Sequence, residues 1–144
     1  MIEQIAHSNQ ILAIIIRHDY SNKGITFFTP DDFSQQLAYM NHPQGKIIQP
    51  HVHNIVKREV LYTKEVLLIK KGKIRVDFYT DDKEYICSRI LEGGDVILLA
   101  AGGHGFEMLE DTEMFEVKQG PYDRTQDKTH FDGIIKTLDI SYME

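Results

Sequence analysis

Residues 65–79, EVLLIKKGKIRVDFY, form the stretch from which the fold is predicted. Two runs of apolar and β-branched residues, 65–69 and 74–79, flank the turn-forming residues 70–73 (KKGK). Two such runs joined by a short connection that contains glycine are typical of a β-hairpin. We therefore predict two antiparallel strands here, paired with each other.

Short runs of the same kind recur along the chain. They lie at residues 11–17, 25–28, 36–40, 47–54, 84–90, 96–100, 106–109 and 114–118, with turn-forming residues between them. Many short strands with little helix between them are typical of two packed antiparallel sheets or a barrel. The sequence therefore predicts an all-β fold with antiparallel strands.

Two segments carry helix signals. Residues 29–32 (TPDD) offer Thr29 as an N-cap, proline in the first turn and two acids near the positive end of a helix dipole, which predicts a short helical turn. Residues 127–140 place Phe131, Ile134, Ile135 and Leu138 at helical spacing. A C-terminal helix lying against the sheets is expected over about 125–140.

Composition narrows the class of protein. A chain of 144 residues suits one domain, 1–144, with its strands over about 11–120. The net charge of −6 argues against nucleic acid as the main partner, because a phosphate-binding surface needs clustered cations. The start of the chain lacks the features of a signal peptide, and the apolar run at 11–16 is too short to span a bilayer. A cytoplasmic protein with no membrane partner is expected.

The triplet His51-Val52-His53 is the most informative polar feature. Side chains two apart on a strand point to the same face, so both imidazoles can reach one metal ion, and Gln49 shares their face. Taken alone, such a triplet is more often a pair of ordinary surface or core histidines than a metal site. Its spacing to other residues changes the interpretation.

Several glycines and polar residues stand at recurring distances around this triplet. Five residues separate Gly45 from His51, six separate Glu65 from Gly72, and five separate Gly93 from Leu99, while His104 follows in a glycine-rich loop. This pattern resembles the cupin superfamily, whose two motifs would map onto Gly45, His51, His53, Glu65 and Gly72, and onto Gly93, Leu99, Ala101 and His104. The resemblance implies a jelly-roll barrel, a double-sheet fold of antiparallel strands.

The resemblance also implies a metal site with His51, His53, Glu65 and His104 as ligands. Three imidazoles and one carboxylate suit one divalent transition metal ion, such as Zn, Fe, Mn, Ni or Cu. The sequence departs from the family pattern in the eleven residues between His53 and Glu65, and in Leu99, Ala101 and Met108 at places usually held by proline, glycine and asparagine. Glu59 remains an alternative carboxylate ligand, because it lies nearer the usual distance from His53.

Four polar residues are candidates for catalysis beside the metal: Gln49, Arg58, Glu116 and Lys118. Arg58 could hold a carboxylate or phosphate of a ligand, or be a solvated loop residue. Glu116 and Lys118 share one face of a late strand and Phe115 and Val117 the other. The polar pair therefore faces either the interior or solvent, and the sequence leaves both open.

The resemblance favours a metal-dependent enzyme of the isomerase, epimerase or lyase type. The metal would act as a Lewis acid on a small polar molecule. Similarity to sugar-isomerase-like cupins points to a sugar or sugar nucleotide. The alternatives are an Fe(II)-dependent dioxygenase and a non-catalytic binder of small ligands. A homodimer is expected, with the apolar strand 11–16 covering an exposed sheet edge at the interface.

Overall fold

The computed structural model describes residues 1–133, whose regular elements are all strands. The chain forms two compact units: unit 1 holds Met1–Tyr20 and the chain from Thr63 onwards, and unit 2 holds Ser21–Tyr62. Each unit is described separately. The strands are β1 Ile2–His7, β2 Gln10–Ile16, β3 Gly24–Phe27, β4 Ala38–Asn41, β5 Glu65–Lys71, β6 Lys73–Tyr79, β7 Tyr85–Glu92, β8 Val96–Leu99, β9 Gly103–Met108 and β10 Glu113–Lys118. The prediction of an all-β, antiparallel chain is confirmed.

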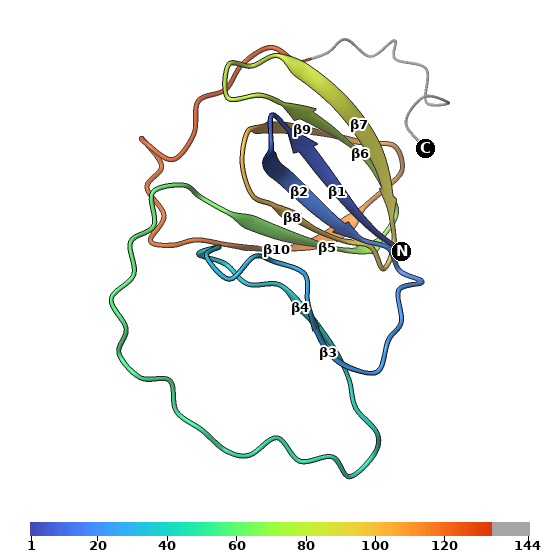
Figure 1. Cartoon of the computed structure of the whole chain (residues 1–144). Helices are drawn as coiled ribbons and strands as arrows, with labels where there is room; N and C mark the ends of the chain where they lie inside the picture. Colours follow the sequence, from blue (N-terminus) through green and yellow to red (C-terminus); the bar gives the residue numbers. More distant parts are fainter. Residues whose placement is uncertain (134–144) are drawn as a thin grey trace. The chain divides into compact units, whose positions relative to one another are not determined.

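Unit 1 contains two antiparallel sheets, with strand orders β1-β2-β8-β5-β10 and β7-β6-β9 (Figure 1). The chain moves to the other sheet between β5 and β6, and again at each connection from β7 to β10. The core lies between the sheets, because apolar residues of both belong to one buried cluster: Ile5, Leu12, Ala13, Ile15, Leu67, Ile69, Ile74, Val76, Phe78, Leu91, Ile97 and Leu99. Within β6, Ile74, Val76 and Phe78 alternate with polar residues, which fixes the inward face of that strand.

The predicted hairpin of 65–69 with 74–79 is wrong. β5 pairs with β8 and β10, whereas β6 pairs with β7 and β9. Gly72, with a φ of 99°, turns the chain from one sheet into the other, and the backbone N–H of Lys73 donates to Thr112 Oγ1 at 3.2 Å. Both runs carry apolar residues on one face, so each can cover the same core from its own side.

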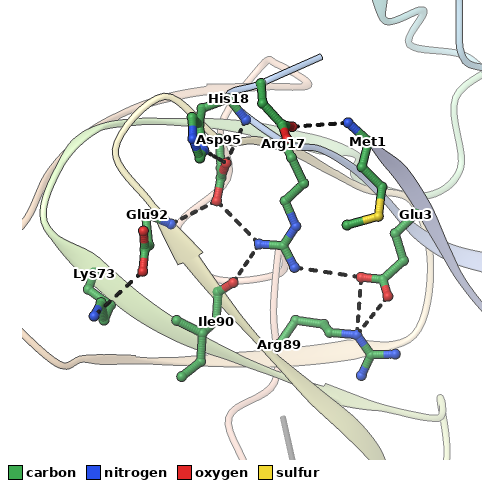
Figure 2. A network of polar contacts seen from close by, with 10 residues as sticks. Met1, Glu3, Arg17, His18, Lys73, Arg89, Ile90, Glu92 and Asp95 are labelled. Atoms are coloured by element: carbon green, nitrogen blue, oxygen red, sulfur yellow. Dashed lines mark hydrogen bonds and ion pairs between the residues drawn. The ribbon is translucent and has the colours of Figure 1, made fainter. Parts of the chain in front are cut away.

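A network of charged residues joins the two sheets along one side of unit 1 (Figure 2). Arg89 on β7 donates to both carboxylate oxygens of Glu3 on β1, at 3.0 and 3.1 Å. Arg17 donates to the carbonyl oxygen of Ile90 at 2.6 Å and to Asp95 Oδ2 at 3.2 Å. These contacts tie the β1 edge of one sheet to the β7 edge of the other.

The strand β2, which covers the predicted interface segment 11–16, lies between β1 and β8. Its residues from Leu12 to Ile16 are buried in the folded chain. The prediction that this strand forms an exposed sheet edge is therefore wrong, and the reason for placing an interface there does not hold. The homodimer itself stays a prediction.

Unit 2 contains the antiparallel hairpin of β3 and β4, with Gly24 opposite Asn41. The predicted helical turn at 29–32 is instead a single hydrogen-bonded turn, in which the N–H of Phe33 donates to the carbonyl of Pro30 at 3.1 Å. Thr29 donates to Gln36 Oε1 at 2.6 Å, and the Gln36 amide donates to the carbonyls of Pro30 and Phe33. Side-chain contacts thus satisfy carbonyls that a continuing helix would have used.

Two further predicted elements differ from the structure. Residues 47–54 form no strand, and Ile47, Ile48 and Val52 are exposed. Of the predicted C-terminal helix, residues 125–133 are not helical, and residues 134–140 lie outside the described part of the chain. No helix within residues 1–133 has the length and apolar character needed to cross a membrane.

Candidate functional site

Glu65 and His104 meet inside unit 1, at one end of the core. His104 Nε2 lies 3.5 Å from Glu65 Oε1, with 26% of the His104 side chain and 19% of the Glu65 side chain exposed. Glu65 is the first residue of β5 and lies on the same strand face as the core residue Leu67. His104, on β9, pairs with the core residue Phe78 of β6. The pair therefore joins the two sheets, and both residues were predicted metal ligands.

The surroundings of Glu65 keep its carboxylate charged. A hydrogen bond with the His104 side chain lowers the pKa of Glu65, partial burial opposes this, and the cations Lys118 and Lys128 again lower it. At neutral pH this group is therefore an anion that can accept hydrogen bonds or bind a cation.

This shift predicts that Glu65 stabilises the fold in a pH-dependent way. Because its pKa is lower in the folded protein than the ordinary value of about 4.3, its contribution is complete above that value. It is lost as pH falls through the folded value. In chelator-treated protein, Glu65→Gln should unfold at lower urea concentration than wild type at about pH 6, and the gap should close towards about pH 3. Glu84→Gln, at an exposed glutamate, is the matched control, and a gap for Glu65→Gln that does not change with pH would contradict the expected role.

Glu116 and Lys118 face the space between the sheets. Of the two orientations left open by the sequence, interior or solvent, the structure has the interior one. Lys118 lies opposite Glu65 and Glu116 opposite the core residue Leu67. Phe115 and Val117 point the other way and are 62% and 54% exposed. The polar pair therefore lies on the same side of the sheet as the Glu65–His104 pair.

Lys118 is held as a cation by neighbouring carboxylates. Its Nζ lies 3.4 Å from Glu116 Oε1 and 4.0 Å from Asp127 Oδ2, and 4.7 Å from the centre of the Tyr122 ring. Burial acts to lower the pKa of Lys118, but Glu116, Glu65 and Asp127 outweigh it and raise the pKa. Lys118 can therefore bind an anionic group but is a poor proton acceptor at neutral pH.

Sequence reasoning missed three residues of this site: Thr63, Tyr122 and Asp127. Thr63 Oγ1 donates to Asp127 Oδ1 at 2.9 Å, which links the start of β5 to a segment more than 60 residues later. No spacing pattern marks Asp127 or Tyr122, because both approach Lys118 from an irregular segment after β10.

The other predicted site residues lie in unit 2, in an irregular and exposed stretch. The His51 and His53 rings contact each other edge to face, with centres 5.2 Å apart. His51 Nδ1 is 2.9 Å from the carbonyl oxygen of Gln49, so the backbone rather than the side chain of Gln49 contacts the histidine. The prediction that Gln49 shares a strand face with the histidines is wrong, because no strand forms here. Arg58 and Glu59 are exposed in the same stretch.

The predicted ligands thus form two pairs. Among residues 1–133, no group of three or more His, Cys, Asp or Glu side chains is arranged to hold a metal ion. Comparisons of the chain with protein-family models, curated proteins and solved structures found no match.

Proposed function

We propose that this protein is a metal-binding cupin and an enzyme that acts on a small polar molecule. The observation that carries the proposal is the Glu65–His104 pair, which meets across the two sheets at 3.5 Å. The repeated passage of the chain between two antiparallel sheets supports a jelly-roll relationship. A cytoplasmic homodimer remains part of the proposal.

The Glu65–His104 distance suits two donors of one ion. Ligand atoms bound at about 2.0–2.1 Å to a tetrahedral or octahedral ion lie about 3 to 3.4 Å from each other. The observed 3.5 Å is close to this spacing, and the lowered pKa keeps Glu65 in the deprotonated form that binds metal.

The His51–His53 pair is suited to supply the remaining donors. A carbonyl oxygen only accepts hydrogen bonds, so the contact with Gln49 requires His51 Nδ1 to carry the proton. The Nε2 lone pair is then available to a metal, and a carbonyl contact of this kind commonly orients metal-binding histidines. Among the residues that the structure describes, no three of the predicted ligands are grouped, and His51 and His53 stay in the proposal as predicted ligands.

The residues around the pair favour an enzyme over a simple binder. A bound divalent ion would supply a Lewis acid for an oxygen of the substrate. Lys118 can hold an anionic or oxygen-rich part of that molecule, and Glu116, 44% exposed, is the candidate proton acceptor. Arg58 remains a candidate for a terminal carboxylate or phosphate, which is consistent with a sugar or sugar nucleotide as the substrate class.

Metal titration tests the proposal directly. Chelator-treated protein titrated with Zn²⁺, Mn²⁺ and Ni²⁺ is expected to bind about one ion per chain, as followed by calorimetry and elemental analysis. His104→Ala and the double substitution of His51 and His53 by alanine should each weaken binding about 100-fold or more, since loss of a supporting partner alone costs about 10–100-fold. His7→Ala removes a histidine outside the proposed site and is the matched control. Equal binding by wild type and both variants would overturn the assignment.

A further inference from the structure

The segment after β10 runs from one sheet of unit 1 to the other. In Figure 1 it is drawn in orange-red, leaving the end of β10 and passing along one end of unit 1 towards β6 and β9. We name residues 127–131 the strap. Each end of the strap is attached to a different sheet.

Asp127 anchors the strap to the first sheet. Its Oδ1 accepts a hydrogen bond from Thr63 Oγ1 at 2.9 Å, and its Oδ2 lies 4.0 Å from Lys118 Nζ. Only 18% of the Asp127 side chain is exposed, although the residues around it are largely solvated. Thr63 precedes Glu65 by two residues and Lys118 lies opposite Glu65 on β10, so this anchor is at the end of β5 where Glu65 lies.

Phe131 anchors the strap to the second sheet. Its ring stands edge-on to the Tyr79 ring, at 5.0 Å between centres and an interplanar angle of 88°. Gly103 leaves the space for this ring, because a Cβ at that position would lie 3.0 Å from Phe131 Cζ. His104 is the next residue of β9 and pairs with the core residue Phe78, so its side chain points inward while the Phe131 ring packs on the outer face of this sheet.

The strap has little slack between these anchors. Four residue steps reach at most about 13–14 Å, and packed sheets lie about 10 Å apart. A segment of this length exceeds the spacing of the sheets by only about 3–4 Å, so it cannot swing far aside while both ends hold. Lys128, within the strap, is close enough to Glu65 to influence its charge.

We infer that the strap, held at Asp127 and Phe131, closes the end of unit 1 at which the Glu65–His104 pair lies, and that its release controls access to that site. The importance of this access rests on the proposed function, but the closure itself can be tested without metal or substrate. Loss of either clamp frees one end, and the opened state should then become more populated.

Chemical modification of His104 measures this access. Chelator-treated protein is exposed to diethyl pyrocarbonate, and the modification rate of each histidine is followed by peptide mass spectrometry. Gly103→Ala crowds the Phe131 ring and weakens its packing on Tyr79, and Asp127→Ala removes the Thr63 and Lys118 contacts. In each variant the His104 rate should rise about fivefold, the change expected from losing one net hydrogen bond or a comparable contact.

Gly105→Ala is the matched control. Gly105 is the other neighbour of His104 on β9, but a Cβ there would meet only Tyr79 Cε2, at the ordinary distance of 4.0 Å. Its His104 rate should stay at the wild-type value. If Gly103→Ala loses its fold, all histidines will be modified faster. The Asp127→Ala variant then decides whether the strap controls access to His104. Rates in both variants equal to that of Gly105→Ala would overturn the strap, and would leave the metal titration unaffected.

Discussion

Replacing Asp95 by alanine is expected to destabilise the protein by about 3–5 kcal/mol, the usual cost of removing one partner of a buried ion pair. Asp95 is 1% exposed and lies at the centre of the network in Figure 2. Its Oδ1 accepts from the backbone N–H of His18 and its Oδ2 from that of Glu92, both at 2.8 Å. Arg17, the charged partner, has only 20% of its side chain exposed and would lose its nearest buried anion.

Asp19→Ala is the control for this change. Asp19 is the same residue type in the same network, but it pairs with the N-terminal amine and 68% of its side chain is exposed. Its removal should leave the urea unfolding midpoint almost unchanged, because exposed ion pairs contribute little. An Asp95→Ala midpoint as high as that of Asp19→Ala would show that the network does not hold the two sheets together.

Most strands of unit 1 could be predicted because their residues alternate or run apolar, although the run 106–109 covers only the second half of β9. Residues 74–79 and 84–90 match β6 and β7 within two residues. β1 was missed, because its apolar residues Ile2 and Ile5 stand three apart and a bulge after Ile5 hides the alternation. Ser8 and Asn9, both with positive φ, turn β1 into β2 without the glycine that usually marks such a turn.

Local pattern could not predict which strands pair. The runs 65–69 and 74–79 present apolar residues that would satisfy a hairpin or two facing sheets equally well. The choice depends on β8, which lies beside β5, and on β9, which lies beside β6, both distant in sequence. Residues 47–54 were predicted as a strand from the local pattern but form none, because a strand also needs a paired neighbour.

The candidate site was predictable to the same degree. Glu65 and His104 were identified through motif spacing, and the structure brings them together. Strand alternation predicted that Glu116 and Lys118 share one face of their strand. Only the register of β10 against β5 shows that this face is the inner one. Asp127 makes long-range contacts from an irregular segment without a periodic signal, and Phe131, which the spacing assigned to a helix, packs against Tyr79 from a stretch that is not helical.

Replacing Gly72 by alanine is the second substitution for which a large loss is expected, about 2–5 kcal/mol. Left-handed backbone costs an L-residue about 1–2 kcal/mol, and forcing extra atoms into a packed region adds about 1–3 kcal/mol. At a φ of 99°, a Cβ on Gly72 would collide with the backbone carbonyl of Asp111 and with Thr112. These are backbone and short side-chain atoms, so no flexible group can move aside.

Gly45→Ala separates the two contributions, because Gly45 has a φ of 87° but nothing lies within 4 Å of its added Cβ. It should show the conformational cost alone, about 1–2 kcal/mol, in the same urea unfolding experiment. The excess for Gly72→Ala then measures the close approach that turns the chain from the sheet of Glu65 into the sheet that carries His104. Equal losses in the two variants would mean that the 111–112 loop yields to the methyl group, and that Gly72 is needed for its backbone angle and not for the packing of the crossing.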